Sequence, residues 1–404
     1  MNPHKTLFKN SPIHQTDNII KSKFLNSLKL INFLYLLCGF RNLSFCVWPS
    51  KFLILKGSRV NIFDEFFRTG IFILLSFIFL QRPPFYYFYY DLFRFWVTFL
   101  VVRYSEKITI KFIENMLNYD FKYSALPTLI GTPAIKNIFM ISILILFIIF
   151  KITIQIILTF MIIRRRFNIM EFITNFVFHI PRLTDFVIVF SACFFLKQIG
   201  YRFSILNKFW KRLPGELIRA PGHWSKDEIA MLIESCRLLH ANLSDILKTF
   251  SYAYGPILVF FLLFLFIDMA YSMFIILYLN RAMTAAILIF AQDSLIIIVL
   301  LKQATWTFNR KRKIISFLRL CQIADLPEEI RIQLQFFMKQ VSCYDNNELA
   351  ASGTFKYNLK LILSIAVALV KCFSIMIQMK SQERFLSFVS LTSDYIQQNK
   401  TINP

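Results

Sequence analysis

The chain of 404 residues lacks the patterns from which most catalytic and metal sites are built. Its seven cysteines form no C-x-x-C pair, and its five histidines show no metal-ligand spacing. Glycine is scarce, with 9 residues, and neither a glycine-rich phosphate loop nor a nucleophile elbow occurs. The sequence therefore predicts a protein that is not an enzyme, has no metal site and needs no cofactor.

Acidic residues are also scarce, whereas apolar residues are abundant. The chain has 23 Asp and Glu against 46 Lys and Arg, and 56% of its residues are hydrophobic, including 48 Phe. This composition is typical of an integral membrane protein. The basic residues lie between apolar runs rather than in a soluble basic domain, so we expect the charge to contact membrane lipid and not nucleic acid.

Seven apolar runs approach the roughly 20 residues that a helix needs to cross a bilayer. They lie at 62–82, 85–104, 136–163, 172–199, 252–280, 282–303 and 356–379. The stretch 27–48 is apolar but is interrupted by polar residues, so we interpret it as an amphipathic or partly inserted segment, with an eighth span as the alternative. The predicted fold class is all-α, a polytopic membrane protein with seven transmembrane helices.

The distribution of Lys and Arg orients these predicted spans. The basic residues are concentrated in 1–61, 103–136, 197–250 and 302–355, and positive loops favour the cytoplasm. This places the N-terminus inside and the C-terminus outside in the plasma membrane, the reverse of a G-protein-coupled receptor.

The predicted topology divides the chain into seven regions. The breakers Pro214-Gly215 and Pro221-Gly222 are expected to end a helix that extends from the fourth span. Asp325 and Glu328 have the spacing of a helix start. The regions are a cytoplasmic N-terminal region with an amphipathic segment (1–61), transmembrane helices 1–4 (62–199), a cytoplasmic linker and helix (200–251), transmembrane helices 5 and 6 (252–303), a cytoplasmic helical anchor (304–355), transmembrane helix 7 (356–379) and an extracellular tail (380–404).

The anchor helix predicted after residue 325 has one apolar face. Its members recur at helical spacing, and such a face has to be buried, so a packing layer below the membrane is expected. They are Ile330, Leu334, Phe337, Met338 and Val341.

The last span carries a polar stripe at helical spacing. At about 100° per residue its members share one face, and charge at bilayer depth costs several kcal/mol, so the stripe cannot face lipid. Either it lines a pore or it is buried against neighbouring helices. The stripe consists of Lys356, Lys360, Ser364, Lys371, Ser374 and Gln378.

Two stretches of the C-terminal third resemble the insect gustatory receptor family. Residues 238–278 are similar to the family's approach to its fifth span. In the last span, Gly353, Phe355 and Gln378 match a G-x-F start followed by a T-Y-x5-Q-F signature. The chain departs from that signature at three positions, Lys371 and Cys372 in place of Thr and Tyr, and Met379 in place of Phe.

This resemblance implies a chemosensory, ligand-gated, non-selective cation channel. It implies a homo- or heterotetramer with related subunits, in which the seventh helix of each lines a central pore. By position, Ile375 and Met379 would be apolar gate residues, with Ser374 and Gln378 beside them. Four copies of Lys371 would repel cations, so Lys371 points away from the axis, or selectivity is altered, or conduction is poor.

Polar residues inside the predicted spans are the candidates for a ligand site. Intramembrane charges are usually buried, paired and functional, and Tyr rings can hold an apolar ligand. We expect an outward-facing pocket among helices 2–6 that binds a small-molecule tastant, with structural ion pairs and an interfacial Tyr belt as the alternative. The candidate ligand residues are Tyr90, Asp91, Gln155, Asp268, Tyr271 and Asp293. A seven-helix G-protein-coupled receptor or a transporter without a pore is the alternative function.

Overall fold

A computed structural model describes six helical ranges and a few short pieces of the chain. The main ranges are 86–124, 180–219, 225–278, 283–320, 327–345 and 359–380, together with 45–47, 52–54 and scattered residues at 31–34, 70–77 and 142–157. The helices are α3 (Tyr86–Ser124), α6 (Ile180–Arg219), α7 (Lys226–Tyr278), α8 (Met283–Leu320), α9 (Glu328–Asp345) and α10 (Lys360–Lys380). One short antiparallel pair, β1 (Phe45–Val47) and β2 (Phe52–Ile54), is the exception to an otherwise helical description.

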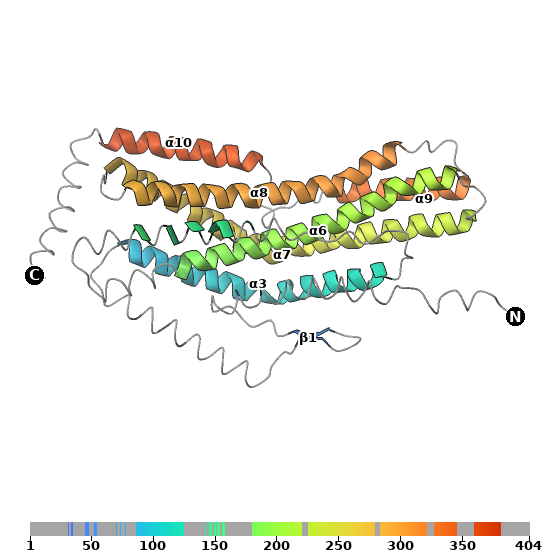
Figure 1. Cartoon of the computed structure of the whole chain (residues 1–404), viewed down its shortest axis with the longest axis horizontal. Coiled ribbons are helices and arrows are strands. Elements are labelled where there is room, and N and C mark those ends of the chain that lie inside the picture. The colour runs from blue at the N-terminus through green and yellow to red at the C-terminus, as the bar shows by residue number, and fades with distance from the viewer. Residues whose placement is uncertain are drawn as a thin grey trace, which may run out of the picture.

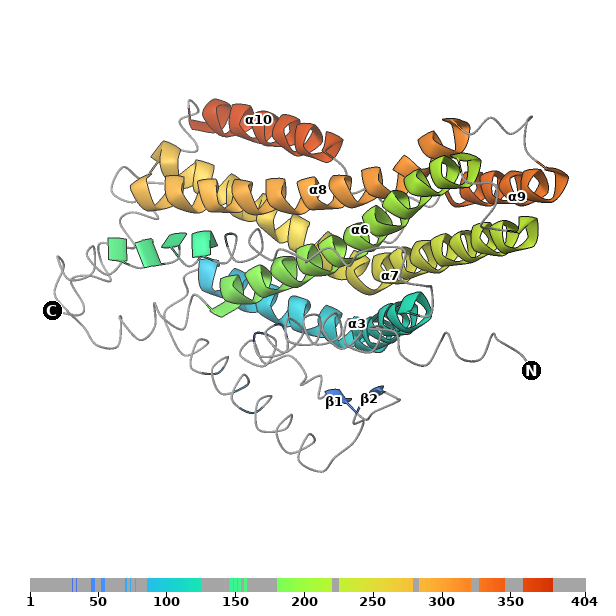
Figure 2. The ribbon, with the colours of Figure 1, turned by 45° about the vertical axis from the view of Figure 1, so that its right-hand side comes forward.

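The long helices lie side by side along one axis (Figures 1 and 2). The closest pairings are α3 with α7 and α6 with α8, and α7 also packs against α8. The short helices lie at opposite ends, with α9 beside the first part of α7 and α10 beside the last part of α7 and the start of α8 (Figure 2). The bundle therefore has two distinct ends joined by continuous helices.

Among the described residues, four helices are long and apolar enough to cross a membrane. They are Thr184–Lys211, Asp227–Tyr278, Met283–Arg319 and Lys360–Met379, which overlap the predicted fourth to seventh spans. The 53 residues of α7 extend about 80 Å at 1.5 Å per residue, far beyond the roughly 30 Å of a hydrocarbon core. Predicted spans 62–82 and 136–163 lie mostly outside the described residues. The predicted span 85–104 lies on α3, which is not among these four helices.

The structure tests the predicted apolar face of α9 and the predicted end of α6. The apolar face of α9 is confirmed, since Ile330, Leu334, Phe337 and Val341 are buried. The predicted helix end is wrong at Pro214-Gly215, which α6 passes, but agrees at Pro221-Gly222, because α6 ends at Arg219 just before that pair. A proline removes one intrahelical hydrogen bond, and the bonds on either side of it carry the helix for one further turn.

The start of α7 is fixed by a capping box. The Ser225 hydroxyl accepts from the Glu228 backbone N–H at 3.2 Å, and the Ser225 backbone N–H donates to the Glu228 carboxylate at 2.9 Å. This reciprocal pair satisfies two N–H groups that a helix start leaves without intrahelical partners. From here α7 runs without interruption through Pro256, so the predicted cytoplasmic helix and the fifth span form one rigid element.

Helices α6 and α8 approach closely at a glycine. A Cβ placed on Gly200 would meet the ring of Trp306, with Cε3 at 2.9 Å, and would lie 3.1 Å from the Thr307 hydroxyl. That hydroxyl donates to the Leu196 carbonyl oxygen at 2.9 Å across the same contact. The absence of a side chain at position 200 therefore sets the spacing of the two helices.

Replacing this glycine tests the contact. We expect Gly200→Ala to lower the stability of the full-length protein by about 1–3 kcal/mol, because an added methyl group overpacks the interface with Trp306. Thermal unfolding in detergent, followed by size-exclusion chromatography, measures the change. Gly70→Ala is the matched control, since a Cβ at Gly70 meets no atom within 4 Å; equal behaviour of the two variants would contradict the close approach.

Candidate functional site

A buried ion-pair cluster joins three helices near the end of the bundle at which α3 and α6 begin and α7 ends. Arg94 of α3 forms ion pairs with Asp185 of α6 and Asp268 of α7, and all three side chains are buried. The Arg94 guanidinium also lies 5.9 Å from the centre of the Phe264 ring. Charges removed from water are tolerated only when they are paired in this way, so the cluster fixes the relative positions of α3, α6 and α7.

Neighbouring residues extend this cluster along α3 and α7. The Tyr90 hydroxyl donates to the Phe264 carbonyl oxygen at 3.0 Å, and the Tyr90 and Phe264 rings pack edge to face. Asp91, beside Tyr90 on α3, is buried as well. Two predicted ligand residues on α3 and one on α7 therefore come together with Arg94 and Asp185.

The structure brings only some of the six predicted ligand residues together. Asp268 pairs with Arg94, which is the arrangement expected from the structural alternative. Asp293 is buried on α8, whereas Tyr271 is 38% exposed and stacks on Phe274 with ring centres 6.4 Å apart. Gln155 lies outside the described residues. Ligand contact by these residues stays a prediction.

Three aromatic residues near the end of α7 lie between Asp268 and the contact with α10. Tyr271, Phe274 and Tyr278 follow one another on α7, and the Phe274 and Tyr278 ring centres are 4.6 Å apart. The Tyr278 hydroxyl donates to the Met376 carbonyl oxygen of α10 at 2.8 Å. The end of α7 is thereby fastened to α10 beside the predicted gate residues Ile375, Gln378 and Met379.

Helix α10 contacts the bundle through one narrow apolar face. Leu369 is buried, and Ile362 and Ile365 are partly buried against α7 and α8. Only 6% of the residues in the most apolar stretch of α10 are buried, far fewer than in the other three candidate spans. In a single copy of the chain, α10 is therefore covered on one side only.

The polar stripe of α10 points away from that covered side. At about 100° per residue, Lys360, Lys371 and Gln378 fall within about 20° of one another, and Leu369 lies about 160–180° from them. All three stripe residues are exposed. Of the two arrangements that the sequence left open, burial against helices of the same chain is excluded for the described stripe residues.

The predicted pore and gate residues share this exposure. Lys371, Ser374, Ile375, Gln378 and Met379 are all exposed, with Ile375 at 56%. The Ser374 hydroxyl donates to the Val370 carbonyl oxygen one turn back, at 2.9 Å. The hydroxyl proton is therefore hydrogen-bonded, and the oxygen gives the exposed face a polar group. Every member of the predicted set therefore lies where a second molecule, lipid or water has to meet it.

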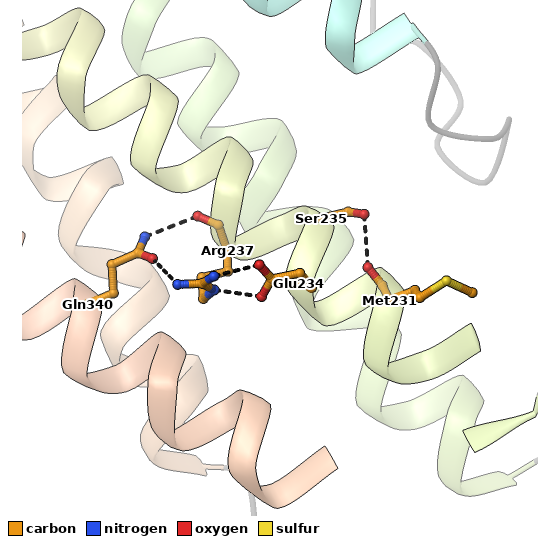
Figure 3. A network of polar contacts seen from close by, with 5 residues as sticks. All are labelled: Met231, Glu234, Ser235, Arg237 and Gln340. Atoms are coloured by element: carbon orange, nitrogen blue, oxygen red, sulfur yellow. Dashed lines mark hydrogen bonds and ion pairs between the residues drawn. The ribbon is translucent and has the colours of Figure 1, made fainter. Parts of the chain in front are cut away.

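A polar clasp holds α9 against α7 at the opposite end (Figure 3). Arg237 donates to both carboxylate oxygens of Glu234, at 2.7 and 2.5 Å, and to the Gln340 side-chain oxygen at 2.9 Å. The Gln340 amide donates back to the Arg237 carbonyl oxygen at 3.1 Å. The sequence shows the i,i+3 spacing of Glu234 and Arg237 but not their partner, because Gln340 is 103 positions away from Arg237.

A second arginine joins α3 to α6 beyond the Arg94 cluster. Arg202 donates to both carboxylate oxygens of Asp120, at 2.7 and 2.5 Å, and to the Gln198 backbone and side-chain oxygens at 3.0 and 3.2 Å. Such a bidentate pair fixes both distance and orientation. Within the described ranges, no group of three His, Cys, Asp or Glu side chains is arranged to hold a metal ion.

Comparison with known proteins supplies no identity for the chain. No model of a known protein family matches the sequence, and no curated protein matches it either.

The Arg94 cluster gives a prediction about stability. We expect Arg94→Met to destabilise the protein by about 3–5 kcal/mol, because it leaves the Asp185 and Asp268 carboxylates buried without their cation. Thermal stability of the purified full-length protein measures the effect. Arg331→Met is the control, because the ion pair of Arg331 with Glu328 spans 3.6 Å between side chains that are 43% and 74% exposed. A comparable loss of stability in both variants would contradict the stabilising role of the buried cluster.

Proposed function

We propose that the protein is a chemosensory receptor of the plasma membrane that acts as a ligand-gated ion channel, with α10 as its pore helix. The observation that carries this proposal is the orientation of the polar stripe, which points away from α7 and α8 while α10 is as apolar as a membrane span. The resemblance to insect gustatory receptors supports the same assignment and implies a homo- or heterotetramer.

The cost of exposing charge to lipid links the stripe to assembly. A lysine near the middle of a membrane helix is expensive when it faces hydrocarbon, so the stripe requires water or another protein surface. Several copies arranged around an axis turn their stripes toward a shared aqueous path and leave their apolar flanks to lipid and to one another. A closed ring of identical subunits meets this requirement with one repeated interface.

The proposed gate and ligand site occupy different parts of this arrangement. Ile375 and Met379 would form an apolar constriction that blocks hydrated ions until it widens. A small-molecule tastant would bind among the predicted helices 2–6, near Tyr90 and Tyr271. The hydrogen bond from Tyr278 to the Met376 carbonyl oxygen offers a physical connection between these two regions.

A change at the proposed gate tests the channel directly. We expect Ile375→Ser to produce a constitutive membrane current in cells expressing the full-length protein, because a polar side chain wets an apolar constriction. Ile377→Ser is the matched control, since it makes the same change two residues away on a flank that is also exposed, 47% against 56%.

The control should leave the current at the level of untransfected cells. Surface biotinylation confirms that each variant reaches the plasma membrane. If both variants reach the surface and neither conducts, the proposed channel function is wrong; if both conduct equally, the assignment of Ile375 to a pore gate is wrong. Tags at Met1 and Pro404, stained before and after permeabilisation, separately test the inside N-terminus, which a G-protein-coupled receptor would reverse.

A further inference from the structure

The charge of the pore helix has one sign. Between Lys360 and Lys380, α10 contains three lysines and no acidic residue. Lys360 and Lys371 both lie on the polar stripe, and Gln378 and two serines supply its remaining polar groups. A pore lined by this stripe would present positive charge and neutral polar groups to a permeating ion.

Lys371 differs from the two terminal lysines by its depth. It lies 11 residues from Lys360 and nine from Lys380, about 16 and 14 Å along the helix axis. Lysines at helix ends can extend their ammonium groups to the membrane surface, but a residue at mid-helix lies too far from either surface to do so. The Lys371 ammonium group therefore needs water or an anion at membrane depth.

The exposed position of Lys371 removes one arrangement, in which its side chain is buried against other helices of the described bundle. The side chain does not point into its own bundle, since it shares a face with Lys360 and Gln378 and lies opposite Leu369. Repeated around an axis, it forms a ring of ammonium groups close to Ile375. Rings of Lys or Arg favour anions in pores, whereas rings of Asp or Glu favour cations.

We infer that the pore of this protein conducts small inorganic anions such as chloride in preference to cations, with Lys371 as the selectivity residue. This inference rests on the proposed function, and it departs from the cation conduction that the family resemblance implies. The departure follows from the residue itself, because Lys371 occupies the position at which the signature of that family has Thr.

The test uses the constitutive current of the Ile375→Ser protein, which needs no ligand. Bath chloride is replaced by gluconate, and separately bath sodium is replaced by N-methyl-D-glucamine, while the reversal potential is recorded. We expect the reversal potential to follow chloride, with a chloride-to-sodium permeability ratio of about ten, which corresponds to ~1.4 kcal/mol.

Substitutions at Lys371 then assign the selectivity. In the Ile375→Ser background, Lys371→Thr should lower the chloride-to-sodium permeability ratio about tenfold, to near one, because the ring of charge is lost. Lys371→Arg should preserve the permeability ratio, because it keeps the positive charge. This result would assign the selectivity to the charge rather than to another property of the lysine side chain. Lys339→Thr, which removes an exposed lysine from α9, is the control and should change nothing.

The outcomes separate this inference from the proposed function. If the reversal potential of the Ile375→Ser protein, which retains Lys371, follows sodium, the inference of an anion pore is wrong and the proposed channel function is unaffected. A chloride current that Lys371→Thr does not alter overturns the role of Lys371. Absence of current from protein that reaches the surface overturns the proposed function and the anion pore with it.

Discussion

A charge that is removed from water must be paired, and a charge without such a partner has to stay hydrated; the described bundle contains an example of each. Arg94 is paired inside the chain, since Asp185 and Asp268 reach it from two neighbouring helices. Lys371 has no such arrangement, because α10 turns it away from α7 and α8. The Arg94 cluster therefore joins three helices of one chain, whereas the ammonium group of Lys371 lies on the exposed side of α10.

Helix α7 contacts both the Arg94 cluster and α10, the helix that carries Lys371. It carries the Glu234 and Arg237 clasp to α9, then Asp268 in the buried cluster, and finally Tyr278 at the contact with α10. A helix of 53 residues transmits displacement along its axis because each residue is held by hydrogen bonds one turn away. A shift of the helix at Asp268 would therefore reach α9 and α10 together.

Features with a helical period could be predicted from the sequence, and features that depend on a distant partner could not. The apolar face of α9 and the polar stripe of α10 follow from spacing alone, because one helix turn sets both. The partners of Arg94 could not be predicted in this way, because Asp185 and Asp268 are respectively 91 and 174 positions away in the chain. The break predicted at Pro214 was wrong because propensity is local, whereas the hydrogen bonds around a proline can sustain a helix.

The two ends of the bundle differ in how far residues of the same chain cover them. At the α9 end, one apolar face of α9 is buried within the chain and Gln340 is hydrogen-bonded to Arg237, although Phe336 of α9 is 55% exposed. At the α10 end, most of a membrane-length helix is uncovered, with polar residues on one line and apolar residues such as Leu363 and Val370 beside it. In the proposed assembly, contacts between copies through α10 would cover this surface. Because the surface includes Lys371, the same contacts would set the charge along the proposed pore.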